Sequence, residues 1–432
     1  MNNEELKKRD LAVLWHPCTQ MKDHETLPLI PIKKAHGVYL EDFDGNLYID
    51  AISSWWVNIF GHTNSYINKK IKEQLDTLEH VILAGFTHEQ VVRLSERLVK
   101  LTPKGLEKCF YADNGSSAVE VALKMSFHAH KNNLKEKNIF VSLKNSYHGE
   151  TIGALSVGDV ELYKETYKPL LIQSIQTPVP QDMSIEAARE AASEFEKLCE
   201  KRATEISAII LEPLIQGAGY MHMYHKEFLT LVREICSRYD IHLIADEVMV
   251  GFGRSGEMFA CSSANITPDF LVLSKGLTGG YLPLSVVLTT DEIYASFYCD
   301  YSENRAFLHS HSYTGNALAC AAANATLDIF EDENVIEKNK ETAKQMQEEL
   351  LKFKALKNVL STRQTGMVCA VELKGYDPKE RIGLKVYEYG LKKGVLLRPL
   401  GHVVYFMPPY IISKDEIKKI MQVAYEAIQS LS

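Results

Sequence analysis

Two apolar runs of this sequence end in charged side chains whose types are suited to catalysis. Residues 269–276 read Asp-Phe-Leu-Val-Leu-Ser-Lys-Gly and place Lys275 near the end of one run. Residues 241–248 read Ile-His-Leu-Ile-Ala-Asp-Glu-Val and place Asp246 at the matching point of the other. A lysine amine that is partly withdrawn from water is a nucleophile, and a buried carboxylate stabilises a nearby positive charge. The two residue types together predict an enzyme.

Both runs have the length and composition of buried parallel strands. In an open α/β sheet, ligands bind in the crevice outside the carboxyl ends of such strands, so Lys275 and Asp246 are expected at one crevice. The pair is suited to pyridoxal phosphate, because Lys275 can form the Schiff base and Asp246 can pair with the pyridinium nitrogen. Each residue also has a structural alternative when it is considered alone. Lys275 could be a surface lysine, and Asp246 could cap the helix that follows its strand.

A third motif is suited to binding an anion. Residues 113–118 read Asp-Asn-Gly-Ser-Ser-Ala, and they close one predicted strand and open a helix. The free N–H groups at the start of that helix, together with the helix dipole, are suited to the cofactor phosphate. Ordinary capping of the helix is the alternative.

Two further residues follow predicted strands. Tyr147 precedes His-Gly, and its ring is suited to stacking on the pyridine ring; a turn tyrosine with a satisfied hydroxyl is the alternative. Glu212 follows the apolar residues 208–211 and, with Gln-Gly-Ala-Gly at 216–219, predicts a polar wall of the crevice. A helix or loop cap is the alternative for Glu212.

Tryptophan and arginine side chains indicate contacts with a substrate. Trp55 and Trp56 are two of only 3 tryptophans, and in a strand they would point in different directions. One or both are predicted to line a pocket for a long apolar substrate, with packing at an edge as the alternative. Arg398 lies between Val-Leu-Leu at 395–397 and Pro399, so it needs an anionic partner. A substrate carboxylate and an internal acid both fit that need.

The elements that must position these residues follow an alternating pattern. From about residue 107 strands alternate with helices, which favours a mostly parallel sheet covered on both faces. The strands are expected at 108–112, 139–143, 208–211, 242–245, 270–273 and 284–288. The expected organisation is an α/β chain with residues 1–60 as the N-terminal part of a small domain, 61–330 as a large cofactor-binding domain, and 331–432 as the C-terminal, α+β part of the small domain.

Composition excludes several classes of function. The 432 residues are 46% hydrophobic and 24% charged, which is ordinary for a globular protein. The net charge of -8, without a long basic run, argues against a nucleic-acid partner. The N-terminus is polar and no apolar stretch reaches membrane-spanning length, so we expect a cytoplasmic protein without a membrane partner. The 8 cysteines form no CxxC pair, which predicts buried thiols and no metal site.

The motifs resemble those of class III aminotransferases of PLP fold type I. The motifs are Glu-Pro at 212–213, Asp-Glu-Val at 246–248, Gly-Phe-Gly-Arg at 251–254 and Ser-Lys-Gly at 274–276. The resemblance covers essentially the whole chain from Trp15 onward. It implies a seven-stranded, mostly parallel sheet in the large domain, and a homodimer with both active sites at the interface.

The resemblance also implies roles for single residues. Lys275, Asp246 and Tyr147 would form the catalytic set. Cofactor contacts would come from Gly115, Ser116, Tyr147, Glu212, Asp246, Lys275 and Ser312, the hydroxyl of Ser312 reaching the phosphate of the partner subunit. Substrate contacts would come from Trp55, Trp56, Arg398, Tyr405, Ser310 and Cys18.

Other motifs are similar to one branch of the family. They are Trp-His-Pro at 15–17, Ser-Trp-Trp at 54–56, Tyr-His-Gly at 147–149, Arg-Pro-Leu-Gly at 398–401 and Met-Pro-Pro-Tyr at 407–410. That branch aminates 8-amino-7-oxononanoate with S-adenosylmethionine as the donor in biotin synthesis. Cys18 stands where tyrosine is common in the branch. Because that tyrosine contacts the substrate, the cysteine leaves the identity of the amino donor open. The alternatives are an ω-aminotransferase that uses lysine as donor or acts on ornithine, 4-aminobutyrate or a diamine, and an aminomutase.

Overall fold

The computed structural model describes residues 1–431; Ser432, the last residue of the predicted 331–432 segment, lies outside the described residues. The chain forms two compact units. We call Tyr66–Asn339 the central unit, and Met1–Ser65 with the chain from Lys340 onward the terminal unit. The domain boundaries expected at residues 60 and 330 stay a prediction. Among the described residues, no helix is long and apolar enough to cross a membrane.

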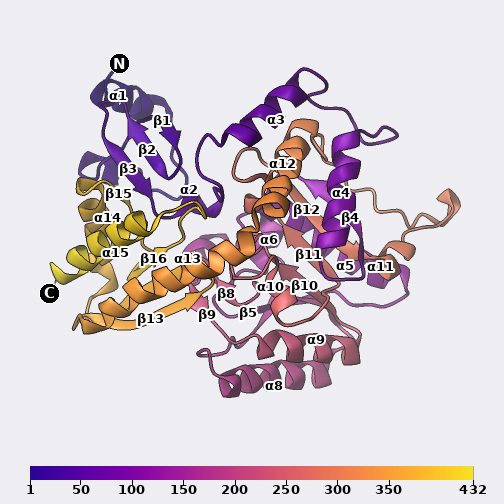
Figure 1. The fold of residues 1–432 in the computed structure, drawn as a ribbon. Helices are drawn as coiled ribbons and strands as arrows, with labels where there is room; N and C mark the ends of the chain where they lie inside the picture. The colour runs from indigo at the N-terminus through magenta and orange to yellow at the C-terminus, as the bar shows by residue number, and fades with distance from the viewer. Residues whose placement is uncertain (432) are drawn as a thin grey trace. The chain divides into compact units, whose positions relative to one another are not determined.

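A seven-stranded sheet forms the middle of the central unit (Figure 1). In spatial order its strands are β4 (Leu106–Ala112), β12 (Ser285–Thr290), β11 (Phe270–Leu273), β10 (His242–Asp246), β7 (Ile206–Leu211), β5 (Ile139–Leu143) and β6 (Ser174–Thr177). Only β12 runs antiparallel to its neighbours, and the other adjacent pairs are parallel. The inner strands are buried and rich in Val, Ile and Leu, because helices cover both faces. The predicted fold class is confirmed.

Helix α5 (Gly115–Asn132) packs on this sheet through small apolar residues. Ala118 and Ala122 are fully buried in the same cluster as Ile210 on β7, Ile244 on β10 and Val272 on β11. The small side chains let the start of α5 lie close to the carboxyl ends of those strands. The other helices of the central unit are α3 (Ser65–Leu75), α4 (Glu89–Leu101), α6 (Ile152–Ser156), α7 (Glu161–Lys164), α8 (Ile185–Arg202), α9 (Glu227–Tyr239), α10 (Ala260–Ser263), α11 (Asp291–Ala295) and α12 (Ala317–Glu333). A short hairpin pairs β8 (Ile215–Gln216) with β9 (His222–Met223).

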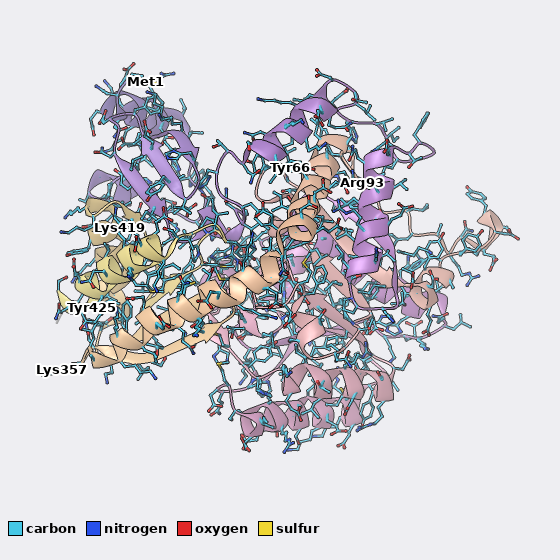
Figure 2. All side chains as sticks on the ribbon, in the orientation of Figure 1. Met1, Tyr66, Arg93, Lys357, Lys419 and Tyr425 are labelled. Carbon is cyan, nitrogen blue, oxygen red and sulfur yellow. The ribbon has the colours of Figure 1, made fainter. Side chains whose placement is uncertain are left out.

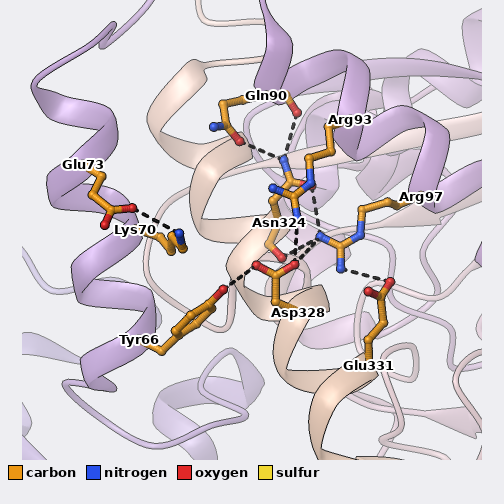
Figure 3. Close-up of polar contacts among 9 residues, drawn as sticks. All are labelled: Tyr66, Lys70, Glu73, Gln90, Arg93, Arg97, Asn324, Asp328 and Glu331. Carbon is orange, nitrogen blue, oxygen red and sulfur yellow. Dashed lines mark hydrogen bonds and ion pairs between the residues drawn. The ribbon is translucent and has the colours of Figure 1, made fainter.

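Three helices of the central unit are tied together by one acid, which Figure 3 shows. Asp328 of α12 accepts a hydrogen bond of 2.8 Å from the Tyr66 hydroxyl of α3. The same carboxylate pairs with Arg93 at 3.0 Å and Arg97 at 2.9 Å, both on α4. Arg97 also donates to the backbone carbonyl of Asn324 at 2.8 Å. The hydrogen bond to Asp328 raises the pKa of Tyr66, so the hydroxyl stays a donor.

Two small sheets make up much of the terminal unit, and side chains fill the space around them (Figure 2). One sheet has the order β1 (Ile32–His36), β2 (Tyr39–Asp42), β3 (Leu47–Asp50) and β15 (Val395–Leu396). The other has β13 (Val359–Thr365), β14 (Val368–Leu373) and β16 (Val403–Phe406). The helices are α1 (Asn3–Val13), α2 (Ser53–Trp56), α14 (Ile382–Lys392) and α15 (Lys414–Gln429), while α13 (Val335–Leu350) contains the boundary between the units. Because β15 pairs in parallel with β3, segments from both ends of the chain share one sheet.

Candidate active site

The structure brings Lys275 and Asp246 to one edge of the central sheet. β10 and β11 are parallel neighbours, and Asp246 stands opposite Val272 in their register. Lys275 follows β11 by two residues, so both side chains emerge at the carboxyl ends of adjacent strands. That edge is where an open α/β sheet binds its ligands.

Lys275 has a strained backbone and a perturbed amine. Its φ of 46° lies in the left-handed region, where non-glycine residues are held only by their surroundings. Burial lowers the pKa of its amine, while the negative charges of Asp246 and Glu212 act in the opposite direction. A lowered pKa increases the fraction of neutral, nucleophilic amine at neutral pH. The geometry therefore supports covalent chemistry at Lys275.

Asp246 is buried and oriented by a histidine that sequence reasoning did not single out. Its Oδ2 accepts a hydrogen bond of 2.8 Å from Nδ1 of His148, and its Oδ1 accepts one of 3.1 Å from the backbone N–H of Val248. The His148 side chain is fully buried, and its Nε2 has no hydrogen-bond partner among the described residues. The available signal was the position of His148 between Tyr147 and a glycine, just after a strand.

Glu212 joins two loops beside this pair. One of its oxygens accepts from the backbone N–H of Tyr147 at 3.0 Å, and the other from that of Gly217 at 2.8 Å. Burial and then the negative charge of Asp246 raise the pKa of Glu212 to about 7, against the opposing effects of His148 and the two hydrogen bonds. The carboxylate therefore holds the backbone of Tyr147, whose half-buried ring meets the edge of Tyr163 with the centroids 5.6 Å apart.

The start of α5 is the candidate anion site. Asn114 caps the helix by accepting from the backbone N–H of Ser117 at 3.0 Å. A Cβ at Gly115 would lie 3.0 Å from the side chain of Val248. Because glycine has no Cβ, the helix can begin in contact with Val248, which follows Asp246 by two residues. A Cβ at Gly149 would lie 1.9 Å from the hydroxyl of Ser116, so the loop after Tyr147 also packs tightly on this turn. The helix has 18 residues, and its N–H groups and dipole favour an anion here.

A segment that carries two predicted residues lies near that anion site. Ser310 and Ser312 are both exposed, and the backbone carbonyl of Ser312 accepts from Nε2 of His80 at 2.8 Å. Between them, His311 lies 3.2 Å from the carboxylate of Asp113, at the start of the anion-binding motif.

Trp55 and Trp56 lie in a left-handed turn and not in a strand. The φ angles of Ser53, Ser54, Trp55 and Trp56 are 51°, 46°, 70° and 76°. The turn is closed by a hydrogen bond from the N–H of Trp56 to the carbonyl of Ile52 at 2.9 Å. A left-handed helical turn of L-residues costs about 1–2 kcal/mol per residue, so tertiary contacts must hold it. As a result Trp56 is 6% exposed and Trp55 40% exposed.

Both indoles contact another predicted residue of the terminal unit. The Trp56 Nε1–H donates to the hydroxyl of Tyr405 on β16 at 3.0 Å. The guanidinium of Arg398 lies 5.3 Å from the ring centroid of Trp55. Among the described residues of the terminal unit, no acid forms an ion pair with Arg398, so an internal counter-ion there is not observed. Cys18 is exposed in the same unit, with a φ of 50°.

Comparisons with known proteins agree with this chemistry. The family model of class-III aminotransferases matches residues 20–428. Two relatives called adenosylmethionine-8-amino-7-oxononanoate aminotransferase are similar to the chain: one of Helicobacter pylori is 55% identical over 99% of this chain and 98% of its own length, and one of Geobacter sulfurreducens is 40% identical over 100% and 99%.

Solved structures are similar over the same extent. The crystal structure of adenosylmethionine-8-amino-7-oxononanoate aminotransferase from Methanocaldococcus jannaschii is 40% identical, with a TM-score of 0.95 over 99% of both chains. An omega transaminase from Pseudomonas jessenii, solved in complex with PMP, is 27% identical with a TM-score of 0.92 over 98% of both chains.

Proposed function

Because the chain belongs to the class-III aminotransferases, we propose that it moves the amino group of S-adenosylmethionine to the ketone of 8-amino-7-oxononanoate, forming 7,8-diaminononanoate for biotin synthesis. The observation that carries this reading is the 55% identity to the Helicobacter pylori aminotransferase of that name over 99% of the chain. The chain is a pyridoxal phosphate-dependent aminotransferase.

The residues of the central unit fit the cofactor. When bound, pyridoxal phosphate supplies an electron sink for the charge left on the substrate carbon after proton removal. We propose that Lys275 holds it covalently and that buried Asp246 faces its ring nitrogen. The start of α5, at Gly115 and Ser116, would bind the phosphate, which is supported by the N–H groups and dipole of an 18-residue helix.

The same central-unit residues account for proton movement. The amine of Lys275, once released from the cofactor, would carry a proton between the substrate carbon and C4′ of the cofactor. The lowered pKa of Lys275 suits both directions of that transfer near neutral pH. Asp246, oriented by His148, would direct its carboxyl group at the ring nitrogen, and Glu212 would hold the loop of Tyr147 so that the ring can stack on the cofactor.

We propose that the terminal unit supplies the substrate contacts. Arg398 would bind the carboxylate of 8-amino-7-oxononanoate, which is supported by the absence of an ion pair between Arg398 and any acid in the described part of the terminal unit. Trp55, Trp56 and Tyr405 would form an apolar wall for its carbon chain, and Cys18 and Ser310 would contact a substrate as well. We also propose a homodimer with shared sites, in which Ser312 reaches the partner's phosphate, and a cytoplasmic location.

This function can be tested by recording the visible spectrum of the purified holoenzyme. The two candidate amino donors, S-adenosylmethionine and lysine, are added separately. We expect S-adenosylmethionine to bleach the yellow absorbance in a half-reaction, and 8-amino-7-oxononanoate to restore it. The control is Lys275→Ala, which should bind the cofactor without turnover. If lysine bleached the absorbance and S-adenosylmethionine did not, the amino donor would be lysine. Bleaching only by ornithine or 4-aminobutyrate would contradict the substrate assignment.

A further inference from the structure

One buried carboxylate accepts four hydrogen bonds at the start of the left-handed turn. Asp50, at the end of β3, is 0% exposed. Its Oδ1 accepts from the backbone N–H groups of Ser54 at 2.9 Å and Ile52 at 3.3 Å. Its Oδ2 accepts from the Ser54 hydroxyl at 2.7 Å and from Nε2 of His62 at 3.0 Å. A buried carboxylate that accepts four hydrogen bonds has few alternative positions, and the groups that donate to it are held in place.

His62 extends this network beyond the turn. Nε2 of His62 faces the carboxylate of Asp50, and the other ring nitrogen, Nδ1, faces Asn58. Nδ1 lies 3.2 Å from the side-chain amide of Asn58, which follows the turn by two residues. The network of Asp50 and His62 therefore contacts the chain both before and after Trp55 and Trp56.

The far side of the turn is held by the strand that carries Tyr405. The Ser53 hydroxyl donates to the backbone carbonyl of Met407 at 2.7 Å, and Trp56 donates to Tyr405 at 3.0 Å. Nothing in the local sequence favours left-handed backbone here, because none of the four residues is glycine. The direction of both indoles therefore depends on contacts from outside the turn.

We propose that Asp50, supported by His62, is a positioning residue that sets specificity for the keto-acid substrate by fixing the left-handed turn. Asp50 acts through Trp55 and Trp56. Trp56 donates a hydrogen bond to Tyr405, and the ring of Trp55 lies against the guanidinium of Arg398. This inference rests on the proposed function for the identity of the substrate, but the geometry of the turn can be measured without any substrate.

The tryptophans themselves give a direct readout. The third tryptophan, Trp15, is 87% exposed, so a Trp15→Phe background leaves the tryptophan bands of the near-ultraviolet circular dichroism to Trp55 and Trp56. In that background we expect Asp50→Asn to change the tryptophan bands. We expect it to raise the KM for 8-amino-7-oxononanoate roughly 10- to 100-fold, because the tryptophans that contact the substrate would be displaced. The cofactor absorbance and the bleaching by the donor should change far less.

The chain offers a matched control for Asp50→Asn. Asp42 is 1% exposed in the same unit and also holds a turn, accepting from the N–H groups of Asp44 at 3.0 Å and Asn46 at 2.8 Å. Asp42→Asn removes an equally buried charge without touching the tryptophans. We expect it to lower stability but to leave the tryptophan bands and the KM unchanged.

A milder variant covers the case in which Asp50→Asn does not fold. Ser54→Ala removes only the 2.7 Å hydroxyl contact, and we expect it to raise the same KM roughly 2- to 10-fold, the effect of one hydrogen bond. Unchanged tryptophan bands and KM in folded Asp50→Asn or in Ser54→Ala would overturn the proposal. If the unmodified enzyme did not use 8-amino-7-oxononanoate, the proposed function would fail. The tryptophan bands would still decide whether Asp50 positions the turn.

Discussion

At the scale of single residues, several residues to which we assign functions have an unusual backbone conformation. Lys275 and the four residues from Ser53 to Trp56 have positive φ angles without being glycine. Such strain persists only where surrounding contacts impose it. In the terminal unit those contacts converge on Asp50, and in the central unit Asp246 is oriented by His148.

Arg398 gives the sharpest prediction at this scale. Arg398→Ala should raise the KM for 8-amino-7-oxononanoate roughly 10- to 100-fold, because a charge-assisted hydrogen bond to a carboxylate is lost. The steady-state KM of purified variants is the measurement. Arg363→Ala is a suitable control, because Arg363 in the same unit pairs internally with Glu372 at 2.6 Å. An unchanged KM in Arg398→Ala would remove Arg398 from carboxylate binding.

At the scale of elements, a histidine pair joins α5 to the sheet, with the His130 ring buried and the His242 ring partly buried. The rings of His130 on α5 and His242 on β10 stack with centroids 4.0 Å apart. His130 donates to the carbonyl of Ser207 at 2.9 Å, and His242 lies 2.9 Å from the hydroxyl of Ser126. Burial is the largest cause that lowers the pKa of both rings, and the neighbouring ring lowers that of His242 further.

This pair predicts a loss of stability in acid. In the unfolded chain histidine takes up a proton below about pH 6.5, whereas the buried rings resist protonation. The free energy of unfolding should therefore fall as the pH drops from about 6.5 to 5. His242→Phe should show a shallower fall in urea titrations across that range, while the exposed His36→Phe should keep the original slope. Equal slopes for His242→Phe and the unmodified protein would contradict this account.

At the scale of the whole molecule, the proposed homodimer makes two measurable claims. Light scattering should give twice the chain mass of 48.8 kDa, because the sites are shared between subunits. Ser312→Ala should weaken cofactor retention during dialysis, since a phosphate contact from the partner is lost. Ser302→Ala, another exposed serine of that segment, should not. A monomeric mass with full cofactor retention would be the contrary result.

The sequence by itself determined six of the seven strands of the central sheet and most residues of the candidate site, but it did not predict the edge strand β6 (Ser174–Thr177). Apolar runs with charged ends specify buried parallel strands, and parallel strands bring their carboxyl ends to one edge; Lys275, Asp246 and Gly115 were found for this reason. Elements with weak apolar periodicity were not predicted, such as α1 (Asn3–Val13), which has no buried residue, and the polar strand β1 (Ile32–His36).

Only the tertiary structure decided how several side chains are held. The contact between His148 and Asp246 joins residues far apart in the chain, as does the pairing of β15 with β3. The left-handed turn at Ser53–Trp56 goes against local preference, and it exists because buried Asp50 and the strand that carries Tyr405 supply its partners. Local patterns encode periodicity and burial, but a conformation that local sterics disfavour is selected by contacts that form only when distant segments meet.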